Sequence, residues 1–365
     1  MESAVKTRLP SLDGWRAIAI LSVLGAHSRG LPGVTPSLDP VFKWAFDGDL
    51  GVRLFFIISG FLITYLLARE NEKAGQISLK HFYLRRGLRI LPVYFTFLII
   101  LAGLQLFTPY TQSGTAWLVN LTFTTNLVKD FSTMPWTSGH LWTLAVEEQF
   151  YLIWPSLIVF FSLCKNSRLA FGLLSVPILL APVFRVMTHT GHYPSGLSAL
   201  FADRSTLNYF DSLAFGCLGA LWLARNKNAV ENLVTKKAAG WMTAGLLLIV
   251  VPYCVARTIG LGIFTVPLGP TCQAIGFSML LLQSLHLPAL GFYRMLNWAP
   301  VRQIGVLSYS IYIWQQIFST PPRFFGLQPV WWLSFPGWLV PVFAVAAISY
   351  YGLERPLLAL RLRYR

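Results

Sequence analysis

The sequence has 365 residues, of which 55% are hydrophobic and only 12% are charged, and its mean hydropathy is +0.57. A soluble globular domain carries roughly 25% charged residues, so this composition excludes a disordered protein, a collagen-like repeat and an ordinary cytosolic enzyme. The apolar residues also lie in long blocks, and ~20 consecutive apolar residues can cross a bilayer as a helix. The sequence therefore predicts an all-α integral membrane protein that crosses the lipid bilayer many times.

The formal net charge is +15, from 29 Lys and Arg residues against 14 Asp and Glu residues. In a soluble protein this excess would indicate nucleic-acid binding. Here the basic residues do not gather on one amphipathic face, and the aromatic residues lie in apolar runs. Because the cytoplasmic loops of membrane proteins collect Lys and Arg, we attribute the charge to membrane topology and expect no nucleic-acid partner.

Ten membrane-spanning helices are predicted, within a single domain over residues 1–365. With the N-terminus in the cytoplasm, the segments on the cytoplasmic side hold most of the Lys and Arg residues, as the positive-inside bias requires, so both termini are expected to be cytoplasmic. The first apolar stretch also resembles a signal peptide, but Asp13 and Arg16 interrupt it and no small-residue cleavage site follows, which favours an uncleaved helix. The expected spans are 14–29, 50–67, 90–107, 142–163, 169–187, 206–224, 240–256, 268–285, 304–320 and 331–350.

Some polar or reactive residues are expected to have only structural roles. Asp211 in the sixth span and Glu354 near the C-terminus are weak signals, for which packing and anchoring are expected. The cysteines lie singly, without the paired spacing of a disulfide framework or a zinc site, so we predict no metal and interpret them as small hydrophobic residues. They are Cys164, Cys217, Cys254 and Cys272.

The first predicted span contains the ionisable residues Arg16 and His27, eleven residues apart. An ionisable group near the bilayer centre costs ~2.5–3.5 kcal/mol on insertion scales, so its presence needs a reason. Eleven steps along a helix put both residues on the same face, about 16 Å apart along the axis. A guanidinium at the cytoplasmic mouth can hold a phosphate, and a deeper neutral imidazole can accept a proton from a hydroxyl. The alternative is a snorkelling arginine and a histidine bonded to a backbone carbonyl.

The fourth predicted span contains two adjacent carboxylates, Glu147 and Glu148. Adjacent helical positions point ~100° apart, so at most one of them can face a given partner squarely. One of the two could orient or charge-stabilise His27, or could pair with Arg16 or Arg53. The alternative is a structural ion pair that holds two helices together.

Further basic residues lie in or beside the early spans. Arg53 near the outer end of the second span could have a functional role or could snorkel outward. Arg85, Arg86 and Arg89 lie close together in the inside segment 68–89, where guanidinium groups could grip the phosphates of a nucleotide. Ordinary positive-inside anchoring explains most such clusters, and charge alone favours that interpretation.

These polar residues lie in short sequence motifs that, together with two further motifs, are distributed along most of the chain. The segments are LDGWRAIAILSVLGAH (12–27), GVRLFFIISGFLIT (51–64), FYLRRGLRILPVYF (82–95), HLWTLAVEEQFYLIWP (140–155), LSYSIYIWQQ (307–316) and LERP (353–356). Together and in this order, they resemble the acyltransferase family 3 of integral membrane acyltransferases.

The resemblance implies a ten-helix protein that transfers an acyl group, most often acetyl, from cytosolic acyl-CoA to a hydroxyl, usually on a sugar. Acceptors in the family include lipopolysaccharide O-antigen, exopolysaccharides, peptidoglycan and small molecules such as macrolides. The family's Arg-(ten residues)-His signature falls on Arg16 and His27, which implies a catalytic role for His27 and a contact of Arg16 with CoA. Further CoA contacts are implied for Arg85, Arg86 and Arg89. Glu147 and Glu148 match a family motif, and their catalytic roles are our inference.

The sequence departs from the family pattern in three places. Many members carry Asp where this chain has Arg53, so Arg53 can mark a subfamily. Many members have a histidine after the aromatic pair near the ninth span, where this chain has Gln315 and Gln316. Some relatives append an extracytoplasmic hydrolase-like domain, whereas this sequence stops at Arg365. We therefore expect a stand-alone transferase that completes acyl transfer alone or hands over to a separate protein.

The sequence thus predicts an O-acyltransferase of a bacterial inner membrane that uses acetyl-CoA to acetylate an envelope or secreted glycan. In this hypothesis His27 acts as general base on the acceptor hydroxyl, and a nearby carboxylate orients it. A transporter or flippase of a lipid-linked sugar is the alternative from another class, although no paired repeats with broken helices are visible. A lipid or a small molecule such as a macrolide is the alternative acceptor.

Overall fold

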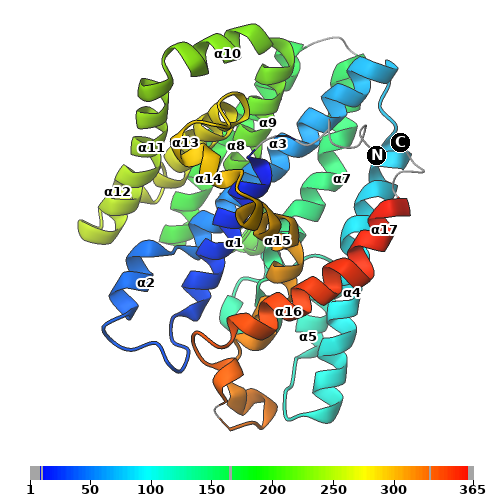
Figure 1. The fold of residues 1–365 in the computed structure, drawn as a ribbon, viewed down its shortest axis with the longest axis vertical. Coiled ribbons are helices and arrows are strands. Elements are labelled where there is room, and N and C mark those ends of the chain that lie inside the picture. The colour runs from blue at the N-terminus through cyan, green and yellow to red at the C-terminus, as the bar shows by residue number, and fades with distance from the viewer. Residues whose placement is uncertain (1–8, 10, 164–166, 329, 361–365) are drawn as a thin grey trace. The chain divides into compact units, whose positions relative to one another are not determined.

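The computed structural model describes residues 9, 11–163, 167–328 and 330–360, which form helices joined by loops and contain no β-strand (Figure 1). The longer helices are α1 (Leu12–Ser28), α3 (Gly48–Ala74), α4 (Leu79–Phe107), α7 (Trp142–Leu163), α8 (Ser167–Thr190), α9 (Thr206–Arg225), α11 (Ala238–Thr258), α13 (Gly269–His286) and α15 (Ala299–Phe318). The shorter α-helices are α2 (Asp39–Ala45), α5 (Gly114–Leu121), α6 (Trp136–Gly139), α10 (Lys227–Lys236), α12 (Gly262–Thr265), α14 (Gly291–Leu296), α16 (Leu339–Ser349) and α17 (Arg355–Leu360). Short 3-10 turns occur at Thr125–Leu127, Phe131–Thr133, Ser195–Phe201, Pro322–Phe325 and Trp331–Leu333, and a π-helical turn, η7, at Tyr350–Glu354.

Within the described residues, six helical segments are long and apolar enough to cross a membrane, and each overlaps one of the second to seventh expected spans. They are Asp39–Ala74, Leu79–Phe107, Trp136–Ser162, Phe171–Thr190, Thr206–Arg225 and Ala238–Thr258. The expected spans 14–29, 268–285 and 304–320 fall on helices α1, α13 and α15, which do not meet the same limits of length and hydropathy. The fold class is therefore confirmed as helical with membrane-spanning helices, while ten crossings and cytoplasmic termini stay predictions.

Two expected boundaries were wrong. The last span was expected at 331–350, but α16 begins only at Leu339 and continues through η7 and α17 to Leu360. Pro336, which lacks an amide N–H, and Gly337, which disfavours a helix by its backbone freedom, precede this start. The inside segment 68–89 was expected to be a loop, but α4 begins at Leu79, where Ser78 Oγ accepts the backbone N–H of His81 at 3.3 Å. The arginine cluster therefore lies on the first turns of α4.

Packing divides the described residues into two compact units that are built from interleaved segments of the chain. Unit 1 comprises the residues up to Ala19, Val52–Ile77 and Phe150–Val306. Unit 2 comprises Ile20–Gly51, Ser78–Gln149 and the residues from Leu307 onward. Helices α1, α3, α7 and α15 each contribute residues to both units.

In unit 1, α9 packs against α8 and α13, and α13 packs along α11. Helix α3 approaches α9 closely at two glycines. A Cβ atom on Gly60 would lie 2.2 Å from the carbonyl oxygen of Leu213, and one on Gly216 would lie 2.1 Å from that of Ile57. Small residues let membrane helices approach to backbone contact, so these two positions set the α3–α9 crossing.

In unit 2, α4 provides one wall of a buried core and also packs against η7 and α17. The hydroxyl of Tyr94 in this wall donates to the carbonyl of Asn120 at 2.7 Å. This core holds the C-terminal half of α15 beside the start of α7. Its members include Val93, Tyr94, Phe97, Leu98, Leu101, Leu141, Leu144, Ile313, Trp314 and Phe325.

The cysteines within the described residues carry free thiols. Cys217 is fully buried, and its Sγ lies 3.6 Å from the carbonyl oxygen of Gly60. It therefore packs as a small hydrophobic residue at the α3–α9 crossing. Cys164 lies outside the described residues.

Candidate active site

His27 lies in the last turn of α1 and is half-buried in unit 2. Its Nδ1 atom is 2.8 Å from Oε1 of Gln315, a residue 288 positions away near the end of α15. Because an amide oxygen only accepts hydrogen bonds, Nδ1 of His27 carries a proton in this contact. In the neutral imidazole with that proton, Nε2 is the basic nitrogen.

The next residue of α15, Gln316, holds a second histidine. Its Oε1 accepts the backbone N–H of His140 at 3.1 Å and lies 2.8 Å from Nδ1 of the same residue. The other ring nitrogen of His140 is 3.1 Å from the carbonyl oxygen of Ile313. Only 3% of His140 is exposed. Since both edges of its ring face protein oxygens, His140 is a buried structural neighbour of His27 rather than a residue at the outer surface.

Trp136, at the start of α6, is the aromatic neighbour of His27. The two ring centroids are 5.1 Å apart in an edge-to-face arrangement, and the indole Nε1–H of Trp136 donates to Ser319 Oγ at 3.0 Å. The side chain is nevertheless 46% exposed. A large aromatic surface is therefore held in a fixed orientation beside the imidazole and remains open on its outer side.

The two predicted carboxylates lie on α7 and are both half-buried. Glu148 interacts electrostatically with Glu147 and with Arg86 of α4. Its Oε1 is buried and accepts no hydrogen bond from the described residues. At Nδ1 of His27 the partner is the neutral amide of Gln315. A role of Glu147 or Glu148 in the reaction stays a prediction.

The arginine cluster lies on one side of α4, because residues three and four apart are neighbours on a helix surface. Arg85, Arg86 and Arg89 are all half-buried. Arg86 interacts electrostatically with Glu148, and Arg89 interacts with Glu354, which is 4% exposed and accepts a hydrogen bond from Ser310 Oγ. Two acidic residues therefore partly neutralise the cluster, and a role of these arginines in binding a phosphate stays a prediction.

Arg16 and Arg53, which the sequence singled out, lie in unit 1 and have different surroundings. Arg16 forms an ion pair with Asp13 one turn earlier on α1, with 3.7 Å between Nη1 and Oδ1, and its side chain is 17% exposed. Arg53 is 5% exposed, and its guanidinium lies 4.5 Å from the ring centroid of Tyr209. Arg53 is therefore enclosed by protein, against an aromatic ring of α9. Arg16 and His27 lie on one uninterrupted helix, which confirms the helical spacing on which their shared face was predicted.

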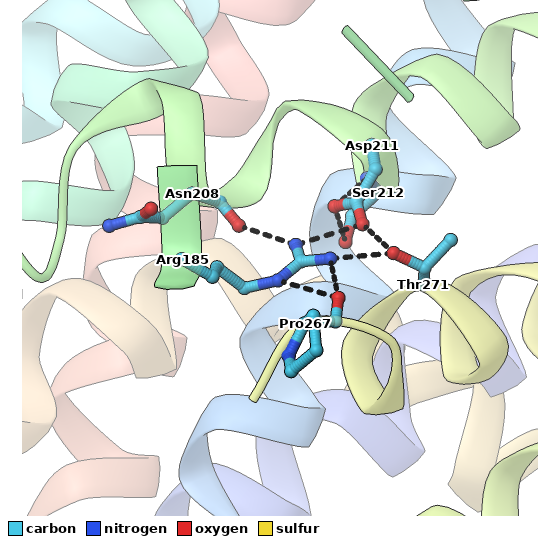
Figure 2. A network of polar contacts seen from close by, with 6 residues as sticks. All are labelled: Arg185, Asn208, Asp211, Ser212, Pro267 and Thr271. Atoms are coloured by element: carbon cyan, nitrogen blue, oxygen red, sulfur yellow. Dashed lines mark hydrogen bonds and ion pairs between the residues drawn. The ribbon is translucent and has the colours of Figure 1, made fainter. Parts of the chain in front are cut away.

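A separate polar network in unit 1 is structural (Figure 2). Arg185 of α8 donates to Asp211 Oδ2 at 2.9 Å and to the carbonyl of Asn208 at 3.0 Å, both on α9. It also donates to the carbonyl of Pro267 and to Thr271 Oγ1, at 2.6 Å each. Thr271 in turn donates to Asp211 at 2.6 Å. Every guanidinium nitrogen has a protein partner, so the network joins α8, α9 and α13, as the packing role expected for Asp211 requires.

Sequence reasoning gave no site role to Gln315 or Trp136 and expected only a structural role for Glu354. A single glutamine in α15, or a single tryptophan at the start of the four-residue helix α6, carries no recognisable catalytic pattern. The doublet Gln315–Gln316 was visible as a departure from the family, and two amides inside an apolar helix are costly enough to have indicated buried polar partners.

A family model described as an acyltransferase domain, acyltransferase 3, matches residues 9–352. The chain therefore belongs to this acyltransferase family, which confirms the resemblance drawn from its motifs.

Curated relatives agree with this assignment. The chain is 28% identical, over 96% of its length, to the peptidoglycan O-acetyltransferase of Listeria monocytogenes, of which it covers 56%. The same identity and coverage relate it to a Bacillus subtilis protein provisionally named as a peptidoglycan O-acetyltransferase, of which it covers 55%. It is also 34% identical, over 45% of its length, to a provisionally named O-acetyltransferase of Staphylococcus aureus, of which it covers 27%. The chain thus spans about half the length of the first two relatives. No solved structure matches it.

Proposed function

We propose that this chain is a bacterial inner-membrane O-acetyltransferase that moves an acetyl group from cytosolic acetyl-CoA to a hydroxyl of an envelope glycan. The family membership supports acyl transfer, and the names of two relatives make peptidoglycan the first acceptor to test. The apolar helices support a multi-pass location in a membrane. The ten-crossing topology with both termini in the cytoplasm is part of the proposal, because it brings the start of α1 to the side where acyl-CoA is found.

The observation that carries the proposal is the hydrogen bond between His27 Nδ1 and Gln315 Oε1. It fixes the neutral tautomer whose Nε2 can accept a proton, which is the requirement for a general base that activates a hydroxyl. His27 lies in the last turn of α1, which in this topology is the end near the outer face. A polar acceptor on the outer side therefore needs to enter the membrane only a short way.

The proposed step is a direct transfer. His27 Nε2 takes the proton of the acceptor hydroxyl while that oxygen forms a bond to the thioester carbonyl carbon. The carbon–sulfur bond then breaks, and the protonated His27 gives its proton to the departing thiolate. The ester and free CoA are the products, and His27 returns to its neutral tautomer.

The phosphate end of the donor is assigned to Arg16, on the same helix as His27. Arg16 lies about 16 Å from His27 along the helix axis, so a guanidinium at Arg16 can bind the phosphate end of a long donor whose thioester reaches His27. The Arg16 side chain also forms an ion pair with Asp13, with 3.7 Å between Nη1 and Oδ1. Within unit 2, Arg85, Arg86 and Arg89 of α4 are a separate candidate for binding phosphate, with Glu148 and Glu354 close to two of them.

The acceptor side is assigned to Trp136. Its ring is 46% exposed beside His27 and is anchored by its own N–H to Ser319. The carbon-bound hydrogens on one face of a sugar ring pack well on such an aromatic surface, while the hydroxyls at the ring edge remain free to react. This arrangement supports a glycan acceptor over a long-chain lipid.

The experiment uses the full chain in proteoliposomes, with labelled acetyl-CoA supplied on the side that bears the termini. Acetyl transfer is followed with peptidoglycan fragments, with a second bacterial polysaccharide, with a macrolide and with no acceptor. We expect label to appear on peptidoglycan fragments and thioester loss to depend on the acceptor.

Label that appears only on the polysaccharide or only on the macrolide would show that this molecule, and not peptidoglycan, is the acceptor. The proposed acetyl transfer itself would stand. If the chain neither binds nor consumes acetyl-CoA but moves a lipid-linked sugar across the bilayer, it is a transporter. That result would overturn the proposed function.

A further inference from the structure

Trp136, the aromatic neighbour of His27, belongs to a helix that is too short to hold its position alone. Helix α6 has four residues, and its N-cap residue, Pro135, makes no side-chain capping hydrogen bond. Isolated helices shorter than ~12 residues are marginal in water, so contacts with other parts of unit 2 must fix α6. The indole N–H on Ser319 is one such contact. It holds the ring, but it does not hold the backbone that carries the ring.

A buried chain of hydrogen bonds holds the backbone of α6. The residue after Trp136 is Thr137, whose Oγ1 lies 2.5 Å from the hydroxyl oxygen of Tyr110. Tyr110 donates to Gln112 Oε1 at 2.9 Å, and Ser138 Oγ donates to the same oxygen at 3.0 Å. Because the single proton of the Tyr110 hydroxyl is used on Gln112, Thr137 is the donor to Tyr110. Gln112 Oε1 thus accepts two hydrogen bonds, and both of them lead to α6.

This chain of hydrogen bonds is anchored on a membrane-spanning helix. Gln105, in the last turn of α4, accepts the backbone N–H of Gln112 at 3.2 Å and the indole N–H of Trp117 at 3.1 Å. Tyr110 lies in the buried core of unit 2. Burial raises the pKa of Tyr110, so its hydroxyl keeps the proton that it donates. The position of Trp136 is therefore tied to α4 through Gln112 and Tyr110.

We propose that Tyr110 and Gln112 are positioning residues for the acceptor: they hold α6 so that the ring of Trp136 faces the sugar beside His27. This inference rests on the proposed function, in which Trp136 binds the acceptor. A half-exposed ring makes few contacts on its outer side, so its direction depends on the backbone that carries it. A tilt of α6 would therefore weaken acceptor binding more than the chemistry at His27, which belongs to α1.

The test compares Tyr110→Phe and Gln112→Met with wild type in proteoliposomes, each alone and in a Trp136→Ala background. Tyr110→Phe removes one hydroxyl, and Gln112→Met removes the shared acceptor but keeps an unbranched side chain of similar size. Gln112 Nε2 has no partner among the described residues, so the second variant loses only the side-chain bonds at Oε1. Tyr293→Phe is the matched control, because Tyr293 is also buried and donates to Gln283 Oε1 at 2.8 Å, in unit 1. The measurements are the KM for the glycan, kcat, acetyl-CoA hydrolysis without acceptor, and the thermal midpoint in detergent.

We expect Tyr110→Phe to raise the KM for the glycan by about two- to tenfold, the range for one lost hydrogen bond between neutral groups. Gln112→Met should raise it at least as much, because two bonds are lost. Acetyl-CoA hydrolysis and kcat at saturating glycan should change little, and Tyr293→Phe should leave the glycan KM unchanged. In the Trp136→Ala background neither variant should raise the KM further, since residues that act through one another have non-additive effects.

A purely structural role would lower the thermal midpoint and would change activity by the same factor with and without Trp136. If Tyr110→Phe does not fold, Thr137→Val removes the same hydrogen bond from the α6 side and carries the same expectation.

Two results would overturn the positioning role while the proposed function stands. One is an unchanged glycan KM in Tyr110→Phe and Gln112→Met, beside a raised KM in Trp136→Ala. The other is an equal rise of the KM with and without Trp136. An unchanged glycan KM in Trp136→Ala would overturn this inference together with the acceptor site. A wild-type protein that never consumes acetyl-CoA would overturn it together with the whole proposed function.

Discussion

His27 Nδ1 lies 2.8 Å from Gln315 Oε1, so the base predicted from the first helix is oriented by an amide from the ninth expected span. The relationship joins two helix ends that are 288 positions apart in the sequence. It places a proton on Nδ1 of His27, so that Nε2 is the basic nitrogen of the neutral ring.

Substitution of His27 by alanine should abolish transfer with little effect on folding. The loss of a positioned general base lowers kcat by about 10²–10⁴-fold, whereas the KM for acetyl-CoA should change little because Arg16 is at the other end of α1. Transfer of labelled acetyl groups measures this directly. His192→Ala, at an exposed position, is the matched control and should keep full activity. Retained activity above a few per cent in His27→Ala would exclude His27 as the base.

Arg16→Ala should raise the KM for acetyl-CoA more than Arg16→Lys. Lysine keeps the positive charge but lacks the two-pronged guanidinium that matches a phosphate. The loss of a charge-assisted hydrogen bond of about 1.5–3 kcal/mol corresponds to a tenfold or larger increase in KM for the alanine variant. Steady-state kinetics with varied acetyl-CoA measures this. Equal effects of the two variants would show that only charge matters at this position.

Trp136→Ala should raise the KM for the glycan by about tenfold, since an aromatic–ligand contact of ~1–2 kcal/mol is lost. Acetyl-CoA hydrolysis without acceptor should change much less, because the indole contacts the thioester end only through His27. Trp136→Phe should recover part of the glycan affinity without the hydrogen bond to Ser319. Trp298→Ala removes another exposed tryptophan, 62% exposed, and serves as control. An unchanged glycan KM in Trp136→Ala would place the acceptor elsewhere.

Arg185→Met should destabilise the protein strongly without touching the predicted base. Removing one partner of a buried ion pair costs about 3–5 kcal/mol, because the remaining charge is left buried. Asp211 is fully buried and would be that charge. The thermal midpoint in detergent measures the effect. The double variant R185M/D211L should regain much of the lost stability. If it is as unstable as the single variant, lost packing and not the unpaired charge of Asp211 causes the destabilisation.

Gly60→Ala should also lower the thermal midpoint, by a different mechanism. The added Cβ would lie 2.2 Å from the carbonyl oxygen of Leu213, so α3 and α9 must move apart, at a cost of about 1–3 kcal/mol. Gly103→Ala is the matched control, because no atom lies within 4 Å of its added Cβ. A midpoint that falls equally in both variants would argue that glycine flexibility, and not the close crossing, explains the first result.

The apolar helices could be predicted from the sequence because membrane insertion depends on local hydropathy. Each of the second to seventh expected spans overlaps a helix that can cross a membrane. The polar residues of the first helix were equally visible, since Arg16 and His27 stand out in an apolar segment and their spacing on a helix is simple geometry. The first and last residues of the helices were harder to predict. The start of α4 at Leu79 was missed because its first turns carry the charge of Arg85, Arg86 and Arg89, and a hydropathy signal begins only after them.

Sequence alone therefore determined that this is a helical membrane protein of an acyltransferase type with His27 as its expected base. Only the tertiary structure decided what orients that base. The partner at Nδ1 is Gln315, and the exposed aromatic surface beside the base is Trp136. The reason is physical: hydropathy and helical spacing act over a few turns, whereas a hydrogen bond between the ends of α1 and α15 depends on how the whole of unit 2 packs.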